Sequence, residues 1–232
     1  MHFLDIDDLD ADQLQSILDS ATAMKAGESE PKLPDTTLAM IYEKPSTRTR
    51  VSFETGMTKL DGHAIYLGPD DIGLSTGREP IRDISRAISR YGEAVMLRLF
   101  DHEDAVEFAE YADVPVVNGL TDAAHPCQTL ADLQTIREAC GGFEDVRTVW
   151  VGDGNNVAQS FILGAALVGL DLTVCTPPGY GVDEDVLERA DALGGRPEVV
   201  SDPAEAVAGA DVVYTDVWVS MGEEDEREEK LA

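Results

Sequence analysis

Positive charge is scarce in this chain. Its 17 Lys and Arg residues, of which only five are lysine, stand against 46 Asp and Glu, and the formal net charge is −29. A surface this acidic repels nucleic acids and anionic membranes, which excludes both as expected partners. The carboxylates run from Asp5 to Glu229 rather than forming a tail. Dispersed carboxylates with few lysines predict a halophilic protein, since concentrated salt screens their repulsion. The alternative is an acidic mesophilic protein.

Cysteine and long apolar runs are scarce as well. The three cysteines, Cys127, Cys140 and Cys175, form no Cys-x-x-Cys pair, which argues against a zinc site and against a disulfide framework. The longest apolar stretch, 161–170, is too short to span a bilayer, and no basic and apolar leader precedes the first helix. We therefore expect a cytoplasmic protein with reduced thiols and no metal.

What the sequence does contain is a repeated alternation of strand-like and helix-like segments. Strands are predicted at 37–42, 64–67, 94–100 and 114–118, with helices between them. A Gly-rich loop is predicted at 68–77, followed by a helix at 80–91 that has Ile81, Ile84, Ile88 and Tyr91 on one face. After Cys140-Gly141-Gly142 the alternation restarts, with strands predicted at 147–152, 171–176, 197–200 and 211–217. The pattern predicts two three-layer α/β domains with parallel sheets, 1–135 and 136–232, joined by a helix that begins near Gln128.

The most informative segment is Ser46-Thr47-Arg48-Thr49-Arg50, where the first strand turns into a helix. The free N–H groups and the dipole of a helix N-terminus favour an anion, and arginine donates well to phosphate oxygens. Arg50 stands one turn before Glu54, so an ion pair within the helix is its expected role. The expected core face of this helix comprises Val51, Phe53, Met57 and Leu60.

Two further motifs help to interpret the segment 46–50. One is His125-Pro126-Cys127-Gln128 at the start of a helix, and the other is Asp216-Val217-Trp218-Val219-Ser220-Met221-Gly222 after a strand. In this order and spacing, the three motifs resemble the transcarbamoylase family over essentially the whole chain. The last motif resembles the branch of that family that acts on ornithine.

The resemblance implies a reaction of arginine metabolism, of the urea-cycle type. In it the carbamoyl group of carbamoyl phosphate passes to the δ-amine of L-ornithine, giving L-citrulline and phosphate without a cofactor. It also implies a homo-oligomer, a trimer in the family. The residues that it assigns to carbamoyl phosphate are Ser46, Thr47, Arg48, Thr49, Arg98, His125 and Gln128, of which Arg98, His125 and Gln128 are catalytic. Arg98 lies inside an apolar strand, where a cation is costly unless an anion pairs with it.

The resemblance assigns the amino acid to the second domain, to Asn156, Asp216, Ser220 and Met221. Another amine, such as putrescine, is the main alternative substrate. The turn Gly152-Asp153-Gly154-Asn155-Asn156 also loosely resembles a dinucleotide-binding turn, although Val157 stands where the third glycine belongs.

The sequence departs from the family in two places. The family carries a His-Cys-Leu-Pro element beyond its Ser-Met-Gly motif, and none occurs here. We therefore expect either a fragment of a longer enzyme or a non-catalytic remnant that binds carbamoyl phosphate. In the loop before Glu79-Pro80, many family members place a Gln or His that reaches a neighbouring subunit, whereas Gly73 and Ser75 stand nearest here.

Overall fold

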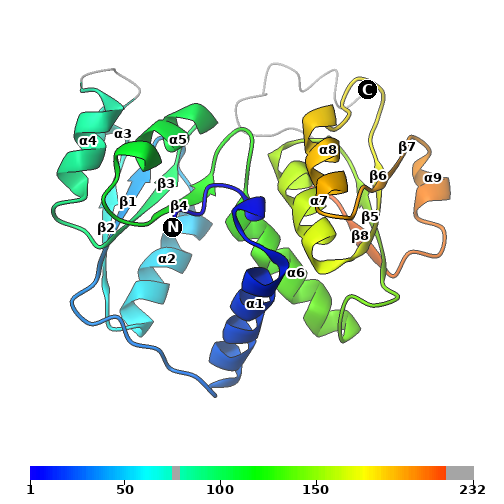
Figure 1. Cartoon of the computed structure of the whole chain (residues 1–232), viewed down its shortest axis with the longest axis horizontal. Helices are drawn as coiled ribbons and strands as arrows, with labels where there is room; N and C mark the ends of the chain where they lie inside the picture. The colour runs from blue at the N-terminus through cyan, green and yellow to red at the C-terminus, as the bar shows by residue number, and fades with distance from the viewer. Residues whose placement is uncertain (75–78, 218–232) are drawn as a thin grey trace. The chain divides into compact units, whose positions relative to one another are not determined.

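The computed structural model describes residues 1–74 and 79–217. The chain divides into two compact units, Met1–Gln134 and Thr135–Ala232. Each unit has a four-stranded sheet whose strands are all paired in parallel (Figure 1). One helix, α6 (Pro126–Cys140), crosses the boundary between the units in the sequence. The predicted fold class is confirmed.

The first unit begins with a 3-10 turn, η1 (Ile6–Asp8), and the helix α1 (Ala11–Ala26). The other elements before α6 are, in chain order, β1 (Thr37–Tyr42), α2 (Thr47–Lys59), β2 (His63–Leu67), α3 (Pro69–Ile72), α4 (Ile81–Ile88), β3 (Ala94–Arg98), α5 (His102–Tyr111) and β4 (Val116–Leu120). The strand order is β2-β1-β3-β4. This order places the ends of β1 and β3 side by side, with Tyr42 opposite Arg98.

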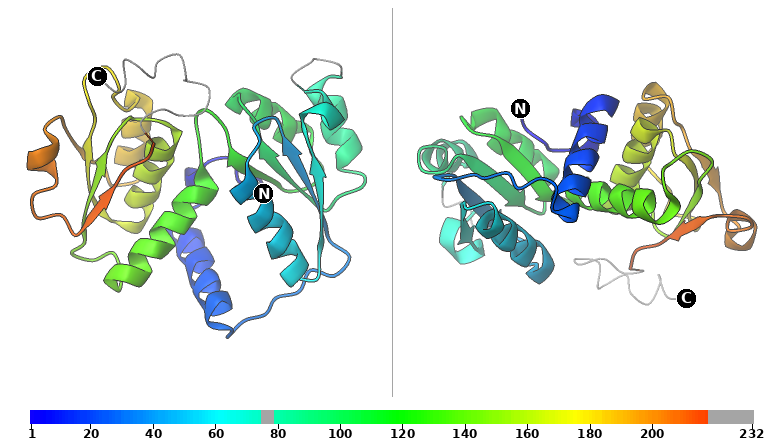
Figure 2. Two further views of the ribbon diagram at one scale, coloured as in Figure 1. Left: turned by 180° about the vertical axis from the view of Figure 1, so that it is seen from behind. Right: turned by 90° about the horizontal axis from the view of Figure 1, so that it is seen from below.

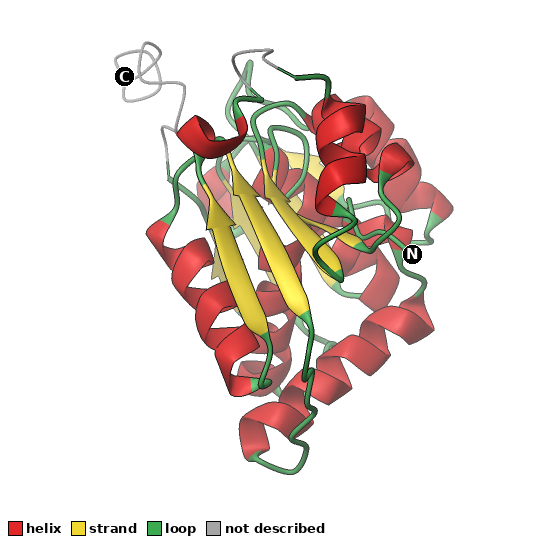
Figure 3. Ribbon diagram, turned by 90° about the vertical axis from the view of Figure 1, so that its left-hand side faces the viewer, coloured by secondary structure: helices red, strands yellow, loops and turns green. Residues whose placement is uncertain are grey.

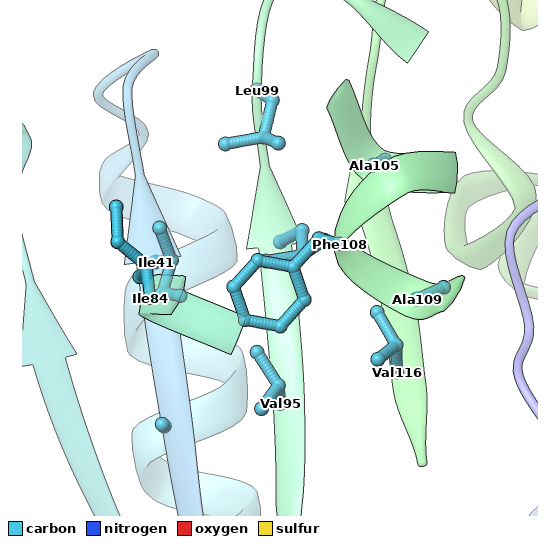
Figure 4. Packing of buried hydrophobic residues seen from close by; sticks show 10 residues of the cluster. Ile41, Ile84, Val95, Leu99, Ala105, Phe108, Ala109 and Val116 are labelled. Atoms are coloured by element: carbon cyan, nitrogen blue, oxygen red, sulfur yellow. The ribbon is translucent and has the colours of Figure 1, made fainter. Parts of the chain in front are cut away.

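Helices cover both faces of this sheet (Figures 2 and 3). On one face, Phe108 of α5 and Ile84 of α4 pack over Ile41 and Val95 of the two central strands (Figure 4). Leu97 belongs to the same cluster. On the other face, Met57 of α2 packs with a group of residues from β1 and β3: Leu38, Met40, Tyr42 and Met96. The central strands are therefore buried on both sides, which is why their sequences are apolar without alternation.

The carboxyl end of β3 contains an irregularity. Leu97 pairs with Asn118 but Arg98 pairs with Leu120, so Gly119 is left out of register. A side chain at Gly119 would place its Cβ 2.6 Å from the sulfur of Met96. A side chain at this bulge would have to displace Met96 and would crowd the carbonyl of Leu97 at 3.1 Å. The bulge re-aims the chain just before the loop that leads to His125.

Two details of the predicted core are wrong. Val51 was expected on the core face of its helix, but it is 55% exposed. The face of α2 that packs against the sheet carries Phe53 and Met57, and Val51 lies outside it. Tyr91 was expected to continue the apolar face of 80–91, but it is 82% exposed, because α4 ends at Ile88. A short helix, α3, also lies in the segment expected to be a loop.

The second unit contains, in order, β5 (Arg147–Val151), α7 (Asn156–Val168), β6 (Asp171–Cys175), α8 (Glu184–Ala192), β7 (Glu198–Val200), α9 (Pro203–Ala206) and β8 (Val212–Tyr214). The strand order is β7-β6-β5-β8. Phe161 of α7 and Trp150 of β5 both meet the ring of Tyr214 edge-on, at 5.1 and 4.8 Å between centroids. These contacts seat α7 against the sheet beside the end of β8.

Candidate functional site

The N-terminus of α2 supplies the first part of the candidate site. Ser46 caps the helix: its hydroxyl accepts from the N–H of Thr49 at 3.4 Å and bonds the hydroxyl of Thr49 at 3.0 Å. The N–H groups of Thr47 and Arg48 lie in the first turn, where a helix provides no acceptor. The predicted strand-to-helix turn with free donors therefore forms where the sequence placed it.

Arg98 supplies a cation beside that helix start. It ends β3 and is only 5% exposed. Its Nε donates to the carbonyl of Lys44 at 3.1 Å, and an Nη donates to the hydroxyl of Thr49 at 3.3 Å. Within the part of the chain that the structure describes, no carboxylate pairs with this guanidinium. Burial lowers the pKa of Arg98, and the charge of Arg48 lowers it further.

The two arginines of α2 differ in their contacts. Arg50 donates to Glu54 at 2.9 Å, and its guanidinium lies 3.9 Å from the centre of the Tyr66 ring. The predicted intrahelical ion pair of Arg50 is thus confirmed. Arg48 is exposed and forms no ion pair with any residue in the ranges 1–74 and 79–217. Arg48 is consequently available to an anion, whereas Arg50 is occupied.

His125 immediately precedes α6, and its carbonyl accepts from the N–H groups of Gln128 and Thr129. Burial lowers the pKa of its imidazole to about 4, with the charges of Arg98 and Lys44 acting in the same direction. The ring is therefore neutral at neutral pH and can donate one hydrogen bond. The effect of Arg98 on this pKa connects the His125 loop electrostatically with the site around α2.

The loop before His125 is held by buried polar groups. The N–H of Thr121 donates to the carbonyl of Ala124 at 2.9 Å. The amide Nδ2 of Asn118 donates to the carbonyl of Leu4 at 2.9 Å and to the hydroxyl of Thr121 at 3.2 Å. His102 adds a contact of 2.7 Å between its Nδ1 and the same hydroxyl. These bonds fix the chain that leads into α6.

In the second unit, the structure brings together the turn before α7 and the segment after β8. Asn155 caps α7 by accepting from the N–H groups of Val157 and Ala158, and its amide donates to Asp216 at 3.2 Å. Asn156 is the first residue of α7. Ser220 and Met221, which the sequence also pointed to, lie outside the described residues.

Gly154 has a structural reason to be glycine. A Cβ on it would lie 2.6 Å from the backbone of Gly181, and its N–H donates to the carbonyl of Tyr180 at 2.9 Å. The close approach that it permits is to another loop of the same unit. This explains the Gly-Asp-Gly turn without a dinucleotide.

Three residues were missed by sequence reasoning. Lys44 offers its carbonyl to Arg98, Asn155 bonds Asp216, and Asp132 accepts from Gln128 at 2.9 Å. The i to i+4 spacing of Gln128 and Asp132 was visible in the sequence. The contacts of Lys44 and Asn155 cross between segments 54 and 61 residues apart, and no local pattern indicates them.

Neither a metal site nor a membrane-spanning helix is present in the described ranges. No group of three or more His, Cys, Asp or Glu side chains there could hold a metal ion. None of the helices there is both long and apolar enough to cross a membrane. The fold and the site together define a parallel α/β protein with arginines gathered at strand and helix ends, an arrangement suited to a small phosphorylated ligand.

Comparison with known proteins identifies the family. Residues 1–138 match the carbamoyl-phosphate-binding domain of the aspartate/ornithine carbamoyltransferases, and residues 144–232 match their aspartate/ornithine-binding domain. The chain belongs to the aspartate/ornithine carbamoyltransferase family, a family of transferases, as the three motifs predicted.

Individual relatives agree with this assignment. The ornithine carbamoyltransferase of Haloquadratum walsbyi is 64% identical over 230 residues, which cover 99% of this chain and 76% of that protein. The solved ornithine carbamoyltransferase of Pyrococcus furiosus has a TM-score of 0.91 at 48% identity, covering 99% of this chain and 75% of the other. The anabolic enzyme of Campylobacter jejuni has a TM-score of 0.93 at 39% identity, with coverages of 99% and 77%.

The uncompensated charge of Arg98 leads to a first prediction. Arg98→Met should lower affinity for inorganic phosphate by about 1.5–3 kcal/mol, because it removes a charged donor. It should not lower the free energy of unfolding, because it also removes a buried charge that no carboxylate in the described ranges pairs with. Calorimetric titration and urea unfolding measure the two quantities.

Arg90→Met is the matched control, since Arg90 is exposed and paired with Asp113. It should leave phosphate affinity unchanged. A variant Arg98→Met that unfolds more easily and still binds phosphate would show that this guanidinium has a structural role instead.

Proposed function

We propose that this chain is an ornithine carbamoyltransferase, which transfers the carbamoyl group of carbamoyl phosphate to the δ-amine of L-ornithine. The observation that carries the proposal is the buried Arg98 guanidinium at the N-terminus of α2, paired with no carboxylate of the described residues. A bound dianionic phosphate would offset the cost of burying this charge. The names of the relatives support ornithine as the acceptor.

Phosphate binding would draw on Ser46, Thr47, Arg48 and Thr49 together with Arg98. The first turn of α2 offers N–H groups and the positive end of its dipole, and the hydroxyl of Thr49 already touches the Arg98 guanidinium at 3.3 Å. The arginines would neutralise the charge of the phosphate before it leaves. The proposed reaction therefore needs no metal ion to stabilise the leaving group.

Arg98 and His125 would polarise the carbonyl. As the amine attacks the carbonyl carbon, negative charge grows on the carbonyl oxygen, and a preorganised donor to that oxygen is typically worth about 3–4 kcal/mol. The low pKa of His125 suits this role, because a neutral imidazole donates without having to lose a proton. The δ-amine attacks in its neutral form, so the carbon–nitrogen bond forms as the bond from the carbonyl carbon to the phosphate oxygen breaks. The attacking nitrogen loses one proton, which can pass to an oxygen of the departing phosphate, and the products are a neutral ureido group and hydrogen phosphate.

The amino acid would be held by the second unit. Asp216 can accept from the α-ammonium of ornithine, together with Ser220, and Asn156 and the backbone of Met221 can bind its α-carboxylate. The contact of 3.2 Å between Asn155 and Asp216 supports this assignment, since it fixes the carboxylate beside the start of α7. Alignment of the δ-amine with the carbonyl would supply much of the rate, roughly 7–11 kcal/mol in favourable cases.

A panel of acceptors tests the proposed function. With carbamoyl phosphate as donor, ornithine should be carbamoylated in preference to putrescine, aspartate and N-acetylornithine, because Asp216 and Asn156 bind the α-amino-acid group that putrescine lacks. Product formation with each acceptor, followed by chromatography, gives the order. Preference for putrescine would overturn the choice of substrate, and carbamoyl phosphate binding without any product would point to a non-catalytic remnant.

The two arginines of α2 provide a second test. Arg48→Ala should weaken carbamoyl phosphate binding by about 1.5–3 kcal/mol, because a charge-assisted contact is lost. Arg50→Ala should leave binding nearly unchanged and reduce stability by about 0.5–1.5 kcal/mol, because it removes the Glu54 pair and the Tyr66 contact. Titration calorimetry and thermal unfolding of both variants measure these effects. Equal losses of affinity would contradict this division of roles.

We also propose that the protein is halophilic, cytoplasmic and a homotrimer. The net charge of −29 and the organism of one relative, Haloquadratum walsbyi, support the first. Support for the second comes from the cysteine content, three cysteines without a Cys-x-x-Cys pair, which is typical of a reducing compartment. Support for the trimer comes from the family resemblance.

Salt dependence tests the halophilic proposal. Raising KCl from about 0.1 M to above roughly 1 M should increase both the melting temperature and the affinity for carbamoyl phosphate. Salt screens the repulsion between an anionic ligand and the acidic surface more than it screens the short-range attraction of the buried Arg98. A ligand affinity that falls steadily with salt would contradict this electrostatic argument, and a constant melting temperature would contradict halophilicity.

A further inference from the structure

The orientation of the Gln128 side chain has a consequence for ligand choice. Gln128 lies in the first turn of α6, three residues after His125, and its Nε2 lies 2.9 Å from Oδ1 of Asp132, one turn later in the same helix. Both side chains are half-buried. A carboxylate oxygen accepts hydrogen bonds, so the end of the carboxamide that faces Asp132 has to be the NH₂ group.

This contact fixes which end of Gln128 is left for a ligand. The oxygen and nitrogen of a carboxamide point in different directions, so Oε1 faces away from Asp132 when Nε2 faces it. No residue in the described ranges donates a hydrogen bond to Oε1. Without Asp132, the amide could rotate and present either a donor or an acceptor at nearly equal cost.

We propose that Asp132 is a positioning residue that makes the site selective for a ligand with an N–H donor. By holding Nε2 of Gln128, it leaves Oε1 as an acceptor in the first turn of the helix that His125 precedes. The carbamoyl group carries an NH₂ where an ordinary acyl phosphate carries carbon. Resting on the proposed function, this inference assigns the discrimination between carbamoyl phosphate and other acyl phosphates to the Gln128–Asp132 pair.

Two ligands of nearly equal shape measure this selectivity. Acetyl phosphate has a methyl group in place of the NH₂ of carbamoyl phosphate and cannot donate to Gln128. The readout is the ratio of the Kd of acetyl phosphate to that of carbamoyl phosphate, from calorimetric titration. A ratio is needed because removing the negative charge of Asp132 changes the affinity for every phosphate by a common factor, which inorganic phosphate reports separately.

Asp132→Ala should reduce this ratio by roughly three- to tenfold, the range that corresponds to one neutral hydrogen bond. Asp132→Asn should give an intermediate ratio, because asparagine can either accept from Nε2 or donate to Oε1. In a Gln128→Leu background, Asp132→Ala should cause no further change, since the effect is transmitted through Gln128.

The chain offers a matched control on α1. Gln15 donates through Nε2 to Asp19 at 2.8 Å with the same i to i+4 spacing, and both are exposed. Asp19→Ala therefore removes an equivalent bond and should leave the ratio unchanged. Melting curves confirm that each variant is folded before its titration.

The possible results separate this inference from the proposed function. If the unaltered chain binds carbamoyl phosphate with preference and Asp132→Ala keeps that preference, the positioning role is wrong and the proposed function stands. A change in ratio that persists in the Gln128→Leu background also overturns the role, because it does not pass through Gln128. If the unaltered chain binds acetyl and carbamoyl phosphate equally, both the inference and the proposed function fail.

Discussion

Placement of one buried cation is the constraint on which the candidate site depends. The carbonyl of Arg98 accepts from the N–H groups of Glu43 and Lys44, so β1 and β3 stay paired just beyond their last residues. Its guanidinium donates to the carbonyl of Lys44 and to the hydroxyl of Thr49. One residue thus joins the end of a strand, the loop after its neighbour and the start of a helix. These hydrogen bonds hold the Arg98 guanidinium in place, and a bound anion would stabilise its charge.

Burial keeps the imidazole of His125 neutral by lowering its pKa, and the charges of Arg98 and Lys44 act in the same direction. The positive charge of the site therefore resides on side chains that do not titrate near neutral pH, and the histidine acts as a donor of fixed protonation. A phosphate dianion bound near Arg98 would oppose part of this repulsion. Binding of such an anion would therefore raise the pKa of His125.

Much of the fold was predictable because it follows from local rules. The apolar run of β1, the Ser46 cap of α2 and the buried α7 all agree with their sequence patterns. Errors occurred where packing overrode pattern. Val51 has the right spacing for a core position, yet the sheet meets the other side of α2, and Tyr91 follows a helix that has already ended. Spacing indicates which residues share a face, whereas the neighbouring layer decides which face is buried.

By itself, the sequence determined the family, the parallel α/β class and the chemical types present in the site, because motifs and apolar periodicity are local properties of the chain. Tertiary structure decided which of those groups act together. Three features depend on distances between separate segments: the absence of a carboxylate beside Arg98 within the described residues, the contact of Arg50 with Tyr66, and the contact between Asn155 and Asp216. Arg48 and Arg50 have the same side chain and lie two residues apart in the same motif. Only the folded neighbours of each distinguish the arginine left for a ligand from the one that stabilises the helix.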